Sequence, residues 1–178
     1  MTRPRLLIVS TRYPFPVIGG DRLRIVNIAR EFAQHCDVDL LCLASNNVEP
    51  PDSIAPFSAI HTLPFSRVRG ALRVLRAALS GVPLQIALYG EPAMYRTLDA
   101  LMPNYDAVIA HLIRAGQFVR HYERAYLEMT DALSMNYERT GRQRGVAFWK
   151  RLVYRFEGAR VRNYEDALLK KFTATFVV

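Results

Sequence analysis

The sequence is short of cysteine, of acidic residues and of long apolar runs. Cys36 and Cys42 are its two cysteines. They lack the spacing of metal ligands, and the histidines do not cluster with them, so we expect reduced thiols and no bound metal or other cofactor. No stretch approaches the roughly 20 apolar residues of a membrane-spanning helix, and the first apolar run is too short for a signal peptide. These absences predict a cytoplasmic protein.

The deficit of acidic residues leaves a positive chain. The sequence has 24 basic and 16 acidic residues, for a net charge of +8. A positive surface favours anionic partners, such as phosphate-bearing ligands or acidic lipid headgroups. The combination of stacking aromatic and basic residues that marks a nucleic-acid module is missing, so we expect no nucleic-acid partner.

Length and composition are those of one folded domain. The 178 residues are 51% hydrophobic and 22% charged, which is typical of globular proteins and not of disordered ones. They are enough for a single domain with a full core and too few for two domains of this kind. The chain has no internal repeats and no low-complexity segments.

Residues 5–35 predict a strand, a loop and a helix. Residues 5–10 form an apolar run without alternation, which suits a strand buried on both faces of a parallel sheet. A proline-rich loop then reaches Gly19 and Gly20, and Asp21 is expected to cap a helix that ends near Phe32. Backbone N–H groups at such a helix start suit phosphate binding.

The two glycines allow a second interpretation. A Gly-Gly pair before a helix is often only a tight turn that needs positive φ. The dinucleotide fingerprint G-x-G-x-x-G directly after a strand is absent, so a nicotinamide or flavin cofactor is poorly supported. Phosphate binding by Gly19 and Gly20 is therefore one of two open alternatives.

The remainder of the chain alternates in the same way. This alternation predicts one Rossmann-like α/β domain over residues 1–178, with a mostly parallel sheet covered by helices on both faces. The expected strands are 38–43, 59–63, 105–110, 126–130 and 173–178, with a short extended segment at 84–89, and the expected helices are 67–79, 91–102 and 146–171.

Two polar residues follow predicted strands directly. His111 follows the strand 105–110, and Asp131 follows the strand 126–130. In an open α/β sheet ligands bind at the carboxyl edge of the strands, so both side chains are candidates for a site. His111 can equally be structural, and Asp131 can equally be the N-cap of the helix that follows it.

The expected helix 67–79 is amphipathic. One interpretation is a helix packed on the sheet with solvated arginines, and the other is a basic surface element that meets acidic membrane lipids. Its apolar face holds Val68, Leu72, Leu75 and Leu79, and the neighbouring face holds Arg69, Arg73 and Arg76.

Four stretches of the sequence stand out as motifs. They are Tyr13-Pro14-x-Pro16-x-x-Gly19-Gly20-Asp21-x-x-Arg24, His111-Leu112-Ile113-Arg114-Ala115, Asp131-Ala132-Leu133-Ser134-x-Asn136-Tyr137 and Arg155-Phe156-Glu157-x-x-Arg160-x-x-x-Tyr164-Glu165. Together these motifs resemble those of family-4 glycosyltransferases, in particular bacterial members that build surface polysaccharides. That family has the GT-B architecture, in which two Rossmann-like domains face a cleft, and the resemblance covers only its N-terminal, acceptor-side half.

The resemblance implies a retaining hexosyltransferase-like enzyme that works without a metal. A sugar would move from a nucleotide-sugar donor to a glycan or lipid-linked acceptor, at the inner membrane face. Its C-terminal donor domain is not in this chain, so we expect no turnover by the chain alone and a donor domain supplied in cis or in trans. By resemblance, Gly19 and Gly20 approach the donor diphosphate, His111 and Asp131 are the catalytic candidates, and Arg12, Arg24 and Arg114 line the cleft.

Two rival functions stay open. One is a non-enzymatic α/β binding module, or a truncated remnant, that associates with an anionic surface or a partner. The other is a different sugar-nucleotide enzyme, because a fold of this kind supports many activities.

Overall fold

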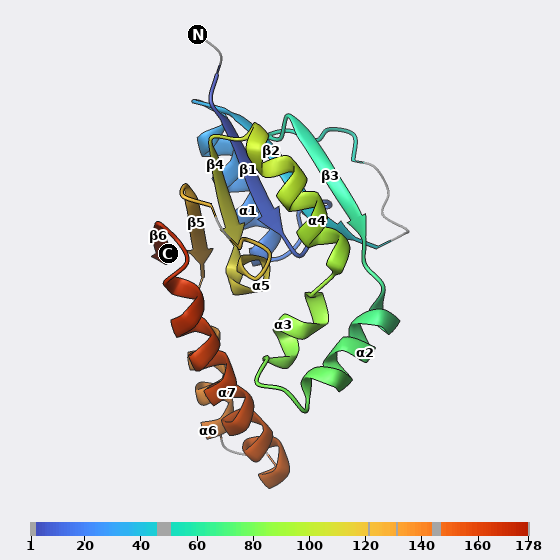
Figure 1. The fold of residues 1–178 in the computed structure, drawn as a ribbon, viewed down its shortest axis with the longest axis vertical. Helices are drawn as coiled ribbons and strands as arrows, with labels where there is room; N and C mark the ends of the chain where they lie inside the picture. Colours follow the sequence, from blue (N-terminus) through green and yellow to red (C-terminus); the bar gives the residue numbers. More distant parts are fainter. Residues whose placement is uncertain (1–2, 46–50, 121, 131, 144–146, 178) are drawn as a thin grey trace.

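A computed structural model describes residues 3–45, 51–120, 122–130, 132–143 and 147–177. They form one Rossmann-like α/β domain around a six-stranded sheet in the order β3-β2-β1-β4-β5-β6 (Figure 1). Every strand pair is parallel, which confirms and sharpens the expected mostly parallel sheet. The strands are β1 Arg5–Ser10, β2 Asp37–Ala44, β3 Ala59–Pro64, β4 Ala107–His111, β5 Ala125–Met129 and β6 Ala174–Val177.

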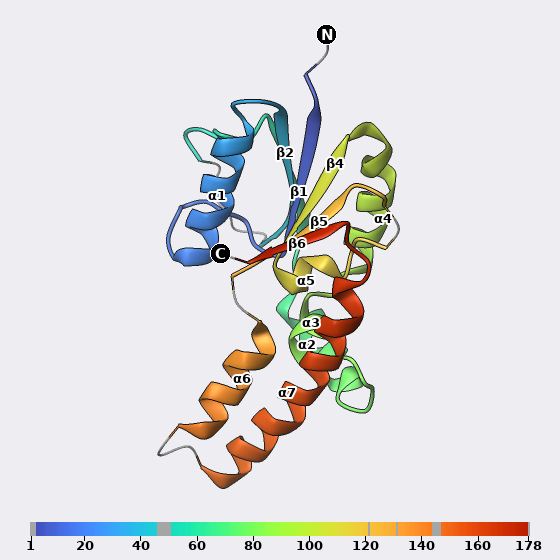
Figure 2. The same ribbon diagram turned by 90° about the vertical axis from the view of Figure 1, so that its left-hand side faces the viewer.

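Helices cover both faces of the sheet, with α1 on one face and α4 and α5 on the other (Figure 2). Two further pairs, α2 with α3 and α6 with α7, extend beyond the carboxyl ends of the strands. The helices are α1 Gly20–Phe32, α2 Arg67–Ala77, α3 Leu84–Tyr89, α4 Pro92–Leu101, the 3₁₀ turn η1 Met102–Asn104, α5 Leu112–Gly116, α6 Leu133–Arg142 and α7 Phe148–Leu169.

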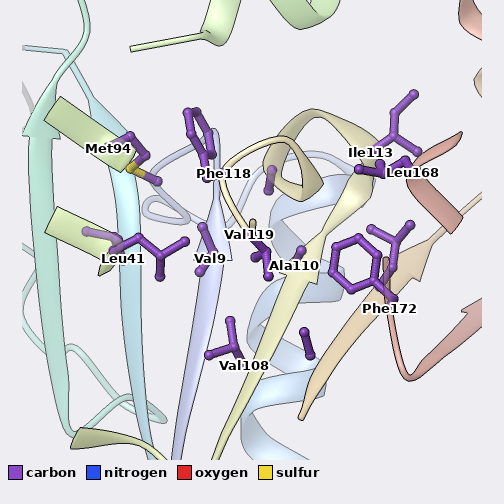
Figure 3. Packing of buried hydrophobic residues seen from close by; sticks show 14 of the residues in the cluster. Val9, Leu41, Met94, Val108, Ala110, Ile113, Phe118, Val119, Leu168 and Phe172 are labelled. Carbon is purple, nitrogen blue, oxygen red and sulfur yellow. The ribbon is translucent and has the colours of Figure 1, made fainter. Parts of the chain in front are cut away.

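The central strand β1 explains the two-layer core. Successive side chains of a strand point to opposite faces, and all four residues of its apolar run are buried. Leu6 and Ile8 pack under α1, while Leu7 and Val9 belong to the larger cluster on the α4–α5 side. Figure 3 shows that larger cluster, in which residues of the sheet meet Met94 of α4, Ile113 of α5, Phe118 from the segment after α5 and Leu168 of α7.

Two local predictions are wrong. Residues 84–89 are the helix α3 and not an extended segment, since Pro83 starts the turn and the buried Glu157 carboxylate accepts the Leu84 amide at 2.9 Å. Asp21 is not the N-cap of α1, because Gly19 holds that position with no side-chain cap, and Asp21 lies in the first turn instead. A six-residue apolar run is ambiguous between strand and helix from its pattern alone, and here tertiary contacts decide.

A carboxylate of the long helix α7 caps the start of α6. Glu165 is buried and accepts the Leu133 amide at 2.6 Å and the Ser134 hydroxyl at 2.6 Å. It therefore supplies the first turn of α6 with the acceptor that no side chain of that helix start provides. Two sequence motifs, one carrying Ser134 and the other Glu165, are thus joined in the structure.

Candidate functional site

The site is built where β4 and β5 end beside the start of α1. His111 is the last residue of β4 and pairs in register with Glu128 of β5. Neighbours in register point to the same face of a sheet. Both side chains are buried, and His111 Nδ1 hydrogen-bonds Glu128 Oε2.

This contact orients the imidazole ring of His111. An ionised carboxylate only accepts hydrogen bonds, so in the neutral ring the proton sits on Nδ1 and the lone pair on Nε2. His111 Nε2 is buried, and no described group of the protein hydrogen-bonds to it. In its neutral form the oriented ring thus offers a hydrogen-bond acceptor whose lone pair is not used within the described protein.

The backbone after His111 is strained. Leu112 has φ 68°, a left-handed conformation that a branched side chain rarely adopts. Strain of this kind costs of order 1–3 kcal/mol and persists only where the surrounding structure holds it. It lets β4 pass directly into α5, which brings Arg114 to the same edge as His111.

Arg24 of α1 completes the buried cluster. Its Nε forms an ion pair with Glu128 Oε1, although the two atoms lack hydrogen-bond geometry. Arg24 Nη2 is buried, with no hydrogen-bond partner among the described residues. Glu128 therefore bridges a histidine and an arginine, and each of them keeps one nitrogen that no described protein group occupies.

Asp21 forms a second cluster one turn earlier on α1. Its Oδ2 lies 3.2 Å from Arg12 Nη1 and 3.4 Å from Arg114 Nη2. The Arg114 guanidinium also lies over the Tyr89 ring, 5.4 Å from its centroid. Across both clusters three guanidinium groups face two carboxylates, so a net positive charge remains at the start of α1.

Gly19 and Gly20 differ in backbone conformation. Gly19 has φ 92° and ψ 157°, a region that is essentially restricted to glycine. Gly20 has no positive φ and begins α1, and a Cβ built on either glycine meets nothing within 4 Å. The turn thus leaves open space in front of the helix start.

A groove of about 470 Å³ runs beside this cluster, a size that suits a small ligand. Its lining includes Gly20, Asp21 and Arg24 from α1, together with Thr130 and Phe176 from beyond β5 and within β6. His111 does not line it. The groove places a ligand-sized space against the α1 side of the cluster.

The structure thus brings together Arg12, Gly19, Gly20, Arg24, His111 and Arg114, all of them predicted from the sequence. Asp131 lies outside the described residues, so its role stays a prediction. Glu128 was missed, although a carboxylate in the apolar stretch Tyr126-Leu127-Glu128-Met129 is a signal that could have found it.

The three arginines predicted to face a membrane do not act as one group. Arg73 is half-buried, where it donates to Glu91 Oε2 and to the Leu88 carbonyl, each at 3.1 Å. Arg69 and Arg76 are exposed. The interpretation of this helix as packed on the sheet is wrong, because α2 rests on α3 through Gly70 and Arg73 while its apolar stripe faces outward.

Among the described residues, no group of three or more His, Cys, Asp or Glu side chains could hold a metal ion. The described helices include none that is long and apolar enough to cross a membrane.

No protein-family model matches this chain, and no curated protein matches it. The strand order of the structure is that of a doubly wound α/β sheet. The residues that bear on function are those of the cluster around His111, Glu128 and Arg24.

Proposed function

We propose that this chain is the acceptor-side domain of a retaining glycosyltransferase, which moves a sugar from a nucleotide-sugar donor to a glycan or lipid-linked acceptor. The observation that carries the proposal is the His111 ring, oriented by Glu128, with a buried Nε2 that no described protein group occupies, at the edge where α1 begins. The motifs that suggested the enzyme family supply its chemical class.

In this proposal the start of α1 stabilises the leaving diphosphate. The first N–H groups of a helix have no partner within the helix, and they carry partial positive charge. Arg12 and Arg114 offset the Asp21 carboxylate, which would otherwise repel a phosphate from the helix axis. Preorganised donors of this kind stabilise developing negative charge without a cation.

His111 is assigned to the transferring sugar. Its Nε2 lone pair accepts a hydrogen bond from a sugar hydroxyl, and Glu128 keeps the proton on Nδ1 so that this lone pair stays available. We further propose that the donor nucleoside is held by a second domain, so that the 178-residue chain binds diphosphate without turning over.

Calorimetry on the 178-residue chain tests the diphosphate site. Inorganic pyrophosphate and nucleoside diphosphates are titrated into the parent, Gly20→Val and the control Gly81→Val. Both glycines have open space around a built Cβ and no positive φ, so neither variant is expected to lose stability. Weaker binding by Gly20→Val alone supports the proposal, and equal binding by all three contradicts it.

Turnover in the full gene product tests His111. His111→Asn keeps a side-chain N–H for Glu128 and removes the Nε2 acceptor. A single positioned group of this kind is worth about 10²–10³ in kcat, so turnover should fall by that factor while diphosphate affinity is kept. Diphosphate binding without any sugar transfer by the full gene product would favour the binding module instead.

A further inference from the structure

Two helices expose apolar faces beyond the carboxyl edge of the sheet. On α2 the stripe faces solvent along its whole length, with Val68 72% exposed and Leu79, just past the helix, 97% exposed. On α7 the first three turns do the same, and Trp149 is 63% exposed. Soluble monomers rarely expose large contiguous apolar patches without a function. The exposed side chains are Val68, Leu72, Leu75 and Leu79 from the α2 segment and Phe148, Trp149, Leu152, Val153 and Phe156 from α7.

The apolar face of α7 and the end of the α2 segment meet in one groove. A depression of about 720 Å³ is lined by Ala78 after α2, by Leu84 of α3 and by Leu152, Val153 and Phe156 of α7. Contacts beneath it hold the helices together, since Arg160 donates to the Ala77 carbonyl at 2.8 Å and Glu157 accepts the Leu84 amide at 2.9 Å. The groove and these contacts connect the end of the α2 segment to the apolar face of α7, and we call the exposed apolar residues of the two segments the α2–α7 surface.

The two segments that carry this surface hold charges of a single sign, while the carboxylate beside Arg151 and Arg155 in the neighbouring pocket is Glu138 of α6, which pairs with Arg162. Residues 66–83 contain four arginines and no acidic residue, and residues 147–156 contain Lys150, Arg151 and Arg155 and again no acidic residue. The nearest carboxylate on α7, Glu157, is buried and paired with Arg160. Apolar side chains surrounded by cations complement a ligand that is apolar inside and anionic at its surface.

That pattern selects among possible occupants. A second copy of this chain bearing the same surface would bring two cationic rims together, which opposes association. An anionic bilayer offers acyl chains for the leucines and aromatic rings and phosphates for the arginines. Tryptophan is enriched at the boundary between headgroups and acyl chains.

We propose that the α2–α7 surface docks the protein on a bilayer that contains anionic phospholipids, with Trp149 and the leucines of α2 inserted at the headgroup–acyl boundary. Arg69, Arg76 and Arg151 then lie at the lipid phosphates, while Arg73 takes no part because it is bound to Glu91. The inference goes beyond the proposed function, since it holds whatever reaction the site carries out.

The only tryptophan in the sequence lies on this surface, so its fluorescence reports docking directly. The 178-residue chain is mixed with vesicles of phosphatidylcholine and phosphatidylglycerol, or with pure phosphatidylcholine. We expect sedimentation with the anionic vesicles, a blue shift of Trp149 emission, and quenching of Trp149 by lipids brominated near the headgroup. Binding should weaken as salt is raised.

Two matched pairs of variants separate charge from insertion. Arg69→Ser with Arg76→Ser should lower the vesicle partition coefficient about thirtyfold, because each arginine near an anionic surface is worth about a factor of five. The control, Arg30→Ser with Arg96→Ser, removes the same charge from exposed positions on α1 and α4 and should bind almost as the parent does. Leu75→Ser with Leu79→Ser should lower binding about tenfold or more, against little change for Met135→Ser on α6.

Each of the other outcomes overturns the proposal. Sedimentation without a blue shift or bromine quenching would mean electrostatic adhesion with no inserted apolar face. A blue shift that depends on protein concentration and appears without lipid would assign the surface to a second copy. Equal binding by the two arginine pairs would mean that only net charge matters. The diphosphate titrations use soluble ligands, so their failure would leave these results unaffected.

Discussion

Replacing Glu128 with glutamine removes one charge from the buried centre of the site without changing its volume. The carboxylate is fully buried and touches two donors, the His111 Nδ1–H group and the Arg24 guanidinium, whose side chain is 19% exposed. Glutamine offers one oxygen and one NH₂ group, so only one of the two donors keeps an acceptor.

The loss of stability in Glu128→Gln comes from the buried Arg24 charge that no longer has a carboxylate partner. Removing one partner of a buried ion pair typically costs about 3–5 kcal/mol, because the other charge stays desolvated. A domain of this size has a free energy of unfolding of about 5–15 kcal/mol, so Glu128→Gln should lose a large part of it. Urea unfolding followed by circular dichroism measures this loss.

The same substitution should move a proton on His111. If the amide oxygen turns to Arg24, the amide NH₂ faces Nδ1, and the neutral ring must carry its proton on Nε2 instead. Nitrogen-15 spectra of the imidazole distinguish the two tautomers. Glu123→Gln makes the same chemical change at an exposed position and should alter neither stability nor tautomer.

Coupling to Arg24 provides a second check. Arg24→Met leaves the Glu128 carboxylate without its cation, and the double variant removes both charges, so it should cost less than the sum of the single changes. A loss below about 1 kcal/mol for Glu128→Gln, comparable to an exposed pair, together with an unchanged tautomer, would refute the buried bridge.

Three further predictions concern single positions. Gly19→Ala should lower the free energy of unfolding, measured in urea, by about 1–3 kcal/mol, because Gly19 has φ 92° and ψ 157°. Gly20→Ala, at a helical position, should leave that free energy unchanged or raise it slightly. Equal losses of stability in the two variants would contradict the difference in their backbone conformations. Burial raises the pKa of the Cys42 thiol to about 12, so a thiol reagent at pH 8 should modify it only on unfolding, and rapid native-state labelling of Cys42 in a Cys36→Ser background would contradict this. Between about pH 9 and 12 the thiol is ionised in the unfolded chain but still protonated in the folded protein. The free energy that this thiol contributes to folding should therefore fall as pH rises through that range. Arg73→Ser should destabilise the protein by about 3–5 kcal/mol, since it leaves the buried Glu91 unpaired, while Arg76→Ser should change stability by no more than about 0.5 kcal/mol; a similar effect of the two would mean that the ion pair contributes nothing.

Much of the site could be predicted because parallel strands deliver their last residues to one edge. The apolar run of residues 5–10 and the run before His111 identify strands by composition alone. The Gly-Gly turn indicates the region where α1 starts, although Gly19 and not Asp21 is the N-cap. The alternation of strands and helices predicts a parallel sheet, and residues that directly follow its strands must then lie at its carboxyl edge. This is why His111 was found without knowledge of any contact, whereas Arg24 and Arg114 were named only by the resemblance to glycosyltransferase motifs.

The partners of those residues could not be predicted in the same way. Glu128 bonds His111 because β4 and β5 pair in one particular register, which the local sequence of neither strand specifies. The outward orientation of the α2 stripe depends on the Arg73–Glu91 pair and on the close approach of α3 at Gly70. An amphipathic pattern tells which side of a helix is apolar, but not whether that side meets protein or solvent.

The length of α7 sets the distance between the exposed Trp149 and the start of α6. Glu165 ties the start of α6 to α7 near the level of the sheet edge, and Trp149 lies sixteen residues earlier on the same continuous helix. At 1.5 Å per residue, that stretch spans about 24 Å. A molecule docked as proposed, with α7 upright on the bilayer, therefore holds Glu165 and the start of α6 about that far above Trp149.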